Sequence, residues 1–157
     1  MQEFIGFAKP LMDLIRNIFS DVRIRKSKES DIVSEIAVNV GILSEFTRNK
    51  KQKCDREIAT KVIMALKHEA YDKYRSQNLN LKRSFSELID DVPAKPIHLE
   101  IAKFYRKIFM LEIVISSLED TGIKPNYRLR LKNLQEIGVG IIKQINRSVK
   151  KKKEKKK

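Results

Sequence analysis

Histidine, cysteine and paired carboxylates are the residues through which this chain could perform catalysis or hold a metal. His68 and His98 stand apart from each other and from Cys54, whereas a metal site needs such ligands at short, regular spacings. Carboxylates occur in adjacent pairs at 90–91 and 119–120, and adjacent positions of a helix do not face each other. The sequence also lacks a glycine-rich phosphate loop and a Gly-x-Ser-x-Gly elbow. We therefore expect a non-enzymatic protein without a metal or a cofactor.

Cys54 is the single cysteine, which excludes an intramolecular disulfide and indicates a reducing compartment. Lys51, Lys53 and Arg56 surround it, and a helix is expected to begin nearby. Both factors favour the thiolate, so they predict a lowered pKa for the Cys54 thiol. One interpretation is a reactive or redox-sensing thiol. The other, which we favour, is an incidental exposed cysteine on a basic turn.

The formal net charge of +14 is the strongest global signal, and it is unevenly distributed. Residues 124–157 contain 13 Lys and Arg and two Glu, a net of +11, which leaves +3 of the +14 for residues 1–123. Such a cationic segment attracts phosphate backbones, anionic lipid surfaces or acidic protein patches. We expect nucleic acid as the first choice of partner, bound through its backbone with little sequence preference. The alternative is a solvated helix face followed by a solubilising tail.

Two groups of basic residues are the candidates for that contact. Lys143, Arg147 and Lys150 follow each other at spacings of four and three, so they share one face of a helix that continues into the lysine tail. The second group lies on a turn, and the sequence leaves open whether the two groups meet in space. The predicted nucleic-acid-binding residues are Lys143, Arg147, Lys150, Lys151, Lys152, Lys153, Arg48, Lys50, Lys51 and Lys53.

The N-terminal segment offers an alternative function. Phe4, Phe7, Leu11, Ile15 and Phe19 give an expected helix an aromatic-rich apolar side, and basic residues follow it. A helix of this kind binds a membrane interface or a partner protein, although a bundle helix with a buried apolar side is the commoner case. The sequence shows no signal peptide and no apolar run of transmembrane length, so we expect a cytoplasmic protein.

Apolar residues at alternating spacings of four and three predict long helices along the chain. The segment 97–118 is apolar on more than one side, so it is expected at the centre of a bundle. Further helices are predicted from Pro10 to about Val22 and at about 32–47, 56–77 and 126–149, with a short segment at 84–89. The predicted fold is all-α: a bundle of four to five principal helices with antiparallel neighbours in one domain, 1–149. A disordered Lys-rich tail is predicted at 150–157.

Two glycines in the last predicted helix, Gly138 and Gly140, leave little side chain at its middle. Another helix is therefore expected to approach closely there. The apolar stripes on several helices would serve an intermolecular bundle as well as an intramolecular one. The sequence accordingly leaves a homo-oligomer open as an alternative to a monomer.

The segment Glu136-Ile137-Gly138, followed by Lys143 and Arg147, forms a short motif in the last predicted helix. It resembles the end of small bacterial four-helix-bundle proteins related to the accessory subunit of diversity-generating retroelements. The resemblance covers at most residues 97–150, and Val-Gly-Ile-Ile at 139–142 stands where those proteins carry Gly-Gly-Trp. Membership would imply a basic, oligomeric, RNA-binding adaptor to a reverse transcriptase. We assign no family on this motif.

Overall fold

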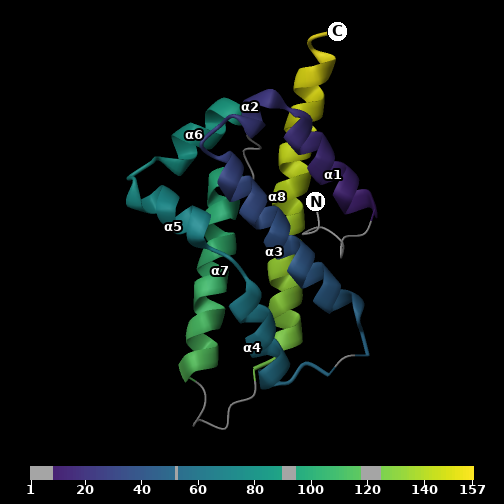
Figure 1. The fold of residues 1–157 in the computed structure, drawn as a ribbon, viewed down its shortest axis with the longest axis vertical. Coiled ribbons are helices and arrows are strands. Elements are labelled where there is room, and N and C mark those ends of the chain that lie inside the picture. Colours follow the sequence, from purple (N-terminus) through teal and green to yellow (C-terminus); the bar gives the residue numbers. More distant parts are fainter. Residues whose placement is uncertain (1–8, 52, 90–94, 118–124) are drawn as a thin grey trace.

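The computed structural model describes residues 9–51, 53–89, 95–117 and 125–157, which form eight helices and no strand (Figure 1). The prediction of an all-α chain is therefore confirmed. None of these helices is long and apolar enough to cross a membrane. The helices are α1 (Lys9–Ser20), α2 (Val22–Arg25), α3 (Ser30–Arg48), α4 (Arg56–Ala65), α5 (Glu69–Ser76), α6 (Leu81–Leu88), α7 (Ile97–Ser117) and α8 (Tyr127–Glu154).

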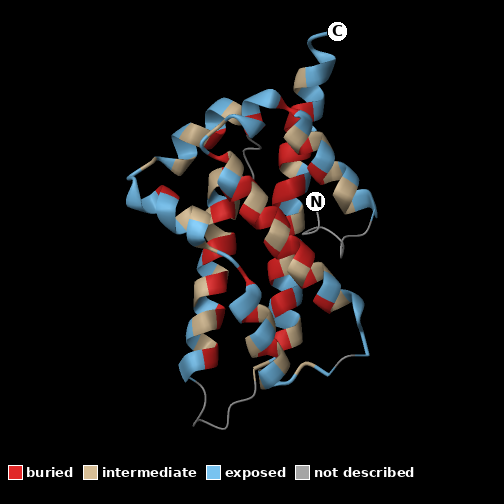
Figure 2. Ribbon diagram, in the orientation of Figure 1, coloured by how far each residue is buried: buried red, intermediate tan, exposed pale blue. Residues whose placement is uncertain are grey.

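The longest helix, α8, takes the central place that the sequence predicts for the segment 97–118. α1, α3 and α7 each pack against it, and α7 runs antiparallel beside it (Figure 1). α4 and α6 pack on α7 in turn. The buried apolar side chains of these helices form one cluster, and the buried residues lie where the helices face one another (Figure 2). The apolar stripes predicted from the sequence are thus the faces that meet in this core.

The two glycines of α8 lie in different surroundings. A Cβ added to Gly138 would meet Val40 of α3 and would lie 2.9 Å from Phe104 of α7, so the predicted close approach is confirmed at this position. A Cβ added to Gly140 would meet nothing within 4 Å. The same prediction is therefore wrong for Gly140, because this residue points away from the packed side of α8.

The helix predicted over 56–77 is interrupted, because α4 ends at Ala65 and α5 begins at Glu69. Asn39, fully buried on α3, holds the break by two hydrogen bonds to the backbone of Lys67. Its Nδ2 donates to the Lys67 carbonyl (2.7 Å), and its Oδ1 accepts from the Lys67 N–H (2.8 Å). The prediction of one continuous helix is wrong because this side chain supplies the backbone partners that a helical turn would otherwise supply.

A buried carboxylate caps the start of α5. Glu35 of α3 accepts from the N–H groups of Ala70 (2.8 Å) and Tyr71 (3.3 Å) and from the hydroxyl of Tyr105 on α7 (2.8 Å). The start of a helix has unsatisfied N–H groups and favours negative charge, so Glu35 meets both needs. Burial, with a further contribution from the Glu35 carboxylate, raises the pKa of Tyr105 well above its usual value. The phenol therefore stays a donor, and the cluster ties α3, α5 and α7 together.

The Lys-rich C-terminus is helical, so the prediction of a disordered tail at 150–157 is wrong. α8 continues to Glu154, and its end projects beyond the other helices (Figure 1). Val149 is only 1% exposed, which shows that core packing reaches the start of the lysine run. The domain boundary predicted between 149 and 150 consequently falls inside α8.

Two lysines in this end of α8 explain why it is held in place. The Nζ of Lys152 donates to the carbonyl of Leu88, the last residue of α6 (2.7 Å). The Nζ of Lys153 donates to Asn17 Oδ1 (2.9 Å) and Ser20 Oγ (2.8 Å) in the last turn of α1. The C-terminal end of a helix has unsatisfied carbonyls and favours positive charge. The lysines therefore fasten α8 to the ends of two neighbouring helices.

Candidate functional site

The described residues contain no group of three or more His, Cys, Asp and Glu side chains that could hold a metal ion. Cys54 is half-buried against the core instead of exposed on the basic turn. Burial raises the pKa of its thiol, and the positive charge of Arg128 only partly opposes this. The predicted lowered pKa is therefore wrong, and Cys54 lacks the surroundings of an activated thiol. The carboxylate pairs at 90–91 and 119–120 lie outside the described residues.

His68 has carboxylate partners that the sequence did not reveal. Its Nδ1 lies 2.6 Å from Asp72 Oδ2, its Nε2 lies 3.3 Å from Glu112 Oε1 on α7, and its ring meets Phe109 edge-on at 4.9 Å. Burial by itself lowers the pKa of His68, but the hydrogen bond to Asp72 and the charges of Glu112, Asp72 and Glu69 outweigh it. The net effect raises the pKa. The contacts link the start of α5 to α7, so we interpret His68 as a structural bridge.

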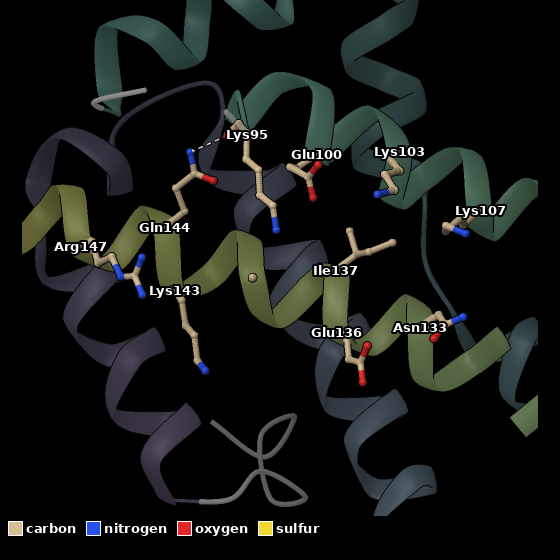
Figure 3. A pocket seen from close by; sticks show the side chains of 11 residues that line it. Lys95, Glu100, Lys103, Lys107, Asn133, Glu136, Ile137, Lys143, Gln144 and Arg147 are labelled. Atoms are coloured by element: carbon tan, nitrogen blue, oxygen red, sulfur yellow. Dashed lines mark hydrogen bonds between the residues drawn. The ribbon is translucent and has the colours of Figure 1, made fainter. Parts of the chain in front are cut away.

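A groove between α7 and α8 gathers basic side chains from both helices (Figure 3). Lys103 and Lys107 come from α7, and Lys143 and Arg147 come from α8. Ile137 lies between the two helices in this view. The groove has a volume of about 560 Å³, and its other lining residues are Lys95, Glu100, Asn133, Glu136, Gly140 and Gln144. Two helices that are separate in the sequence, α7 and α8, thus build one basic recess.

Hydrogen bonding positions one end of the groove. The side chain of Lys95, which precedes α7 in the chain, extends toward α8 (Figure 3). The Nε2 of Gln144 on α8 donates to the Lys95 carbonyl (3.1 Å). Lys143 also lines a second groove, in which Arg48 of α3 takes part. Arg48 is therefore the member of the predicted turn group that shares a groove with the predicted α8 group.

The groove carries a net positive charge although two carboxylates line it. Five cations against Glu100 and Glu136 give a formal charge of +3. Within the described ranges, none of the five cations lies within 4.0 Å of a carboxylate oxygen. Charges of one sign in a recess with low-dielectric walls focus the field and attract counter-ions. The arrangement therefore favours an anionic ligand.

The basic lining continues along the helix pair. A neighbouring recess of about 530 Å³ shares Lys103, Lys107 and Asn133 with the α7–α8 groove. It adds Arg106 of α7 and Arg130 of α8. α8 rises by about 25 Å between its positions 130 and 147, at about 1.5 Å per residue. Cations therefore follow a path long enough for several successive phosphates of a nucleic-acid chain.

The chain matches no protein-family model, no curated protein and no solved structure. Lys ammonium and Arg guanidinium groups bind phosphate and carboxylate oxygens through charge-assisted hydrogen bonds. The groove therefore has the side chains of a binding site for a polyanion.

The predicted residues at the C-terminal end of α8 divide into two kinds. Lys150 and Lys151 are exposed beyond the groove. Lys152 and Lys153 instead donate to acceptors in α6 and α1, so the fold already engages them. Sequence spacing could not separate these lysines, because the difference lies in which helices end beside them.

The turn lysines Lys50, Lys51 and Lys53 are exposed at the other end of α8. The guanidinium of Arg128, in the first turn of α8, donates to the Asn49 carbonyl (3.4 Å), which places the turn beside that end. α8 has 28 residues, which corresponds to a length of about 42 Å. The turn lysines and the C-terminal lysines therefore lie far apart and do not form one continuous patch.

The sequence prediction missed the basic residues contributed by α7. Lys103, Arg106 and Lys107 have spacings of three and four from the first, which places them on one side of a helix. That spacing was available as a signal. What the sequence could not supply was the partner helix, because the α7 cations matter only where α8 places Lys143 and Arg147 across the groove.

Some residues of the alternative N-terminal surface are packed into the core. Ile15 is buried, with Leu11 and Phe19 half-buried against the core. Phe4 and Phe7 lie outside the described residues. The described part of α1 thus directs apolar side chains toward α8.

Proposed function

We propose that this chain is a non-enzymatic helical-bundle module that binds the phosphate backbone of nucleic acid through the groove between α7 and α8. One observation carries the proposal. Lys103 and Lys107 face the same recess as Lys143 and Arg147, and none of these four pairs with a described carboxylate. Lysines and arginines that only confer solubility have no reason to converge from two helices on one recess.

The mechanism of binding is charge neutralisation. Each phosphate that contacts a groove cation releases condensed counterions, so the affinity falls steeply with salt. Backbone contacts of this kind position a strand and carry no sequence information. The exposed Lys150 and Lys151 extend the positive surface, and the module would act as an adaptor that holds nucleic acid without changing it. A protein-interaction or peripheral-membrane role through α1 is the alternative outcome.

Binding of a labelled oligonucleotide across a salt series tests the proposal. The groove variant carries Lys103→Gln, Lys107→Gln and Arg147→Gln, and the control carries Lys155→Gln, Lys156→Gln and Lys157→Gln, so both lose the same formal charge. Neutralising three groove contacts should make the slope of log K against log salt shallower by about 2 for a single strand, at about 0.7 per contact. The control should keep most of the slope, because its lysines lie outside the groove.

A second variant gives an effect of the opposite sign, which a folding defect cannot imitate. Glu100 and Glu136 line the groove and repel phosphate. Replacing both by Gln should raise the affinity for the same oligonucleotide at about 50 to 200 mM salt, the range in which backbone binding responds most clearly. If neither the groove triple nor the glutamate double variant changes binding, the groove is not the site. Binding of the wild-type chain to lipid vesicles but not to oligonucleotide would favour the α1 alternative.

A further inference from the structure

The lining of the α7–α8 groove includes a glycine that the packing of the fold does not require. Gly140 is exposed in the interior of α8, and a Cβ at this position would meet nothing within 4 Å. Glycine destabilises a helix interior relative to alanine, so its presence needs another explanation. Gly138, two residues earlier, has a packing explanation because Val40 and Phe104 leave no room for a side chain there. At Gly140 the open space belongs to the groove that this residue lines.

The shape of the groove distinguishes a single strand from a duplex. The axes of packed helices lie about 8–10 Å apart. A B-DNA duplex is broader than its own major groove, which is about 12 Å wide. A duplex is therefore too broad to enter the recess between α7 and α8 and would touch cations only at its rim. A single backbone is narrower and can enter the recess as far as the main chain at Gly140, which has no side chain to keep it away.

The lining also indicates which side of the strand faces the protein. None of the described residues that line this groove or its continuation is aromatic. Proteins that take bases into a single-strand groove use aromatic side chains as stacking platforms. A groove with cations and without such platforms favours the phosphates inward and the bases outward.

We infer that the groove takes single-stranded nucleic acid, with Gly140 as the point where the phosphate backbone approaches the main chain of α8 most closely. The inference rests on the proposed function and adds to it the substrate class and a specificity-determining residue. Gly140 acts by leaving space, and the charges of Lys103 and Lys143 supply the attraction. A side chain at position 140 would lift the strand away from both walls.

The experiment compares labelled polythymidine with a mixed-sequence duplex of the same length, using the full chain. The wild-type chain should bind the single strand at least about tenfold more tightly than the duplex. Gly140→Met should lower the single-strand affinity by about tenfold and leave duplex binding nearly unchanged. The matched control is Leu129→Met, an exposed position of the same helix outside the groove, which should change neither affinity. Thermal unfolding of both variants verifies that they remain folded.

The possible failures are distinguishable. Equal affinity for single strand and duplex, or an unchanged single-strand affinity in folded Gly140→Met, would overturn the inference. The proposed function would survive either result if the groove lysines still control the salt slope. Absence of binding to both probes by the wild-type chain would overturn the proposed function and the inference together.

Discussion

Two pairs of basic side chains on α8 have opposite surroundings. Near the C-terminal end, Lys152 and Lys153 donate to acceptors in the last turns of α6 and α1. Farther toward the middle, Lys143 and Arg147 line a groove and pair with no described carboxylate. Helices that end beside α8 present unsatisfied carbonyls and polar side chains, which engage an ammonium group. A helix that runs alongside α8 has a satisfied backbone, so the cations between the two remain available to a ligand.

The two glycines of α8 show the same contrast in packing, and they give the largest expected effect. Gly138→Ala should lower the free energy of unfolding by about 1–3 kcal/mol, because the new methyl group must displace Val40 or Phe104. Gly140→Ala should raise it by up to about 1 kcal/mol, because helix propensity improves without a new contact. Urea denaturation of both variants measures the difference. Effects of the same sign and size would break the contrast between a packed and an open side of α8.

The long helices could be predicted from the sequence because their apolar stripes are uninterrupted. The predictions at 32–47 and 97–118 correspond to α3 and α7 within two residues at each end. The short segment predicted at 84–89 begins earlier, at Leu81, because Asn80 caps α6 by accepting from the Arg83 N–H (3.1 Å). Local caps are visible in a sequence, but several residues compete for the role, so the start of a short helix is harder to predict than its existence.

The break between α4 and α5 could not be predicted from the local sequence. The apolar spacing continues through Leu66, Ala70 and Tyr74, as it would in one helix. The break depends on Asn39 and Glu35, which reach the segment only after α3 has packed beside it. Their tertiary hydrogen bonds outweigh a local pattern worth only tenths of a kcal/mol per residue, about 0 to 0.7 on the propensity scale.

The end of α8 offers a second test of the contrast, with a smaller expected effect. Lys152→Met should lower the free energy of unfolding by about 1 kcal/mol, because it removes a charged donor from a part-buried carbonyl of α6. Lys153→Met should lower it by less, because its acceptors in α1 are exposed to solvent. The matched controls Lys150→Met and Lys151→Met should stay within about 0.5 kcal/mol of the wild type, as exposed substitutions usually do. Urea denaturation provides the values. Equal losses at all four positions would mean that the lysine run acts only through its total charge.

Only the α8 side of the candidate groove could be predicted from the sequence. Lys143 and Arg147 were identified from their spacing, whereas Lys103 and Lys107 were not, although they also share a helix face. A helical period shows which residues lie together on one helix, but it does not show which helix lies opposite. The lysine run at the C-terminus shows the same limit of sequence-based prediction. A run without an apolar face was predicted to be disordered, and the acceptors that hold it belong to segments distant in sequence.

The contacts of His68 with Asp72 and Glu112 should make the stability of the fold depend on pH, and this is the smallest of the expected effects. A histidine titrates between about pH 5.5 and 8, so His68 can make the stability of the fold depend on pH in this window. Asp72 and Glu112 favour the protonated ring, and the net result is a pKa of His68 above its usual value in the folded chain. A raised folded pKa stabilises the protonated state, so this contribution is complete below the unfolded pKa. It is lost as the pH rises through the folded value.

Stability should therefore fall between about pH 6 and 8 by less than about 1 kcal/mol from this group, because the partners are partly exposed and solvent screens them. The measurement is the difference in unfolding free energy between the wild type and His68→Gln across that range, which cancels the titration of every other group. The difference should shrink toward high pH. Asp72→Asn should reduce it as well, because it removes the nearer carboxylate. A difference that does not depend on pH would mean that the charge of His68 adds nothing and that this residue contributes only through its packing on Phe109. The polar groups beside the helix ends would then stabilise the fold by hydrogen bonding alone.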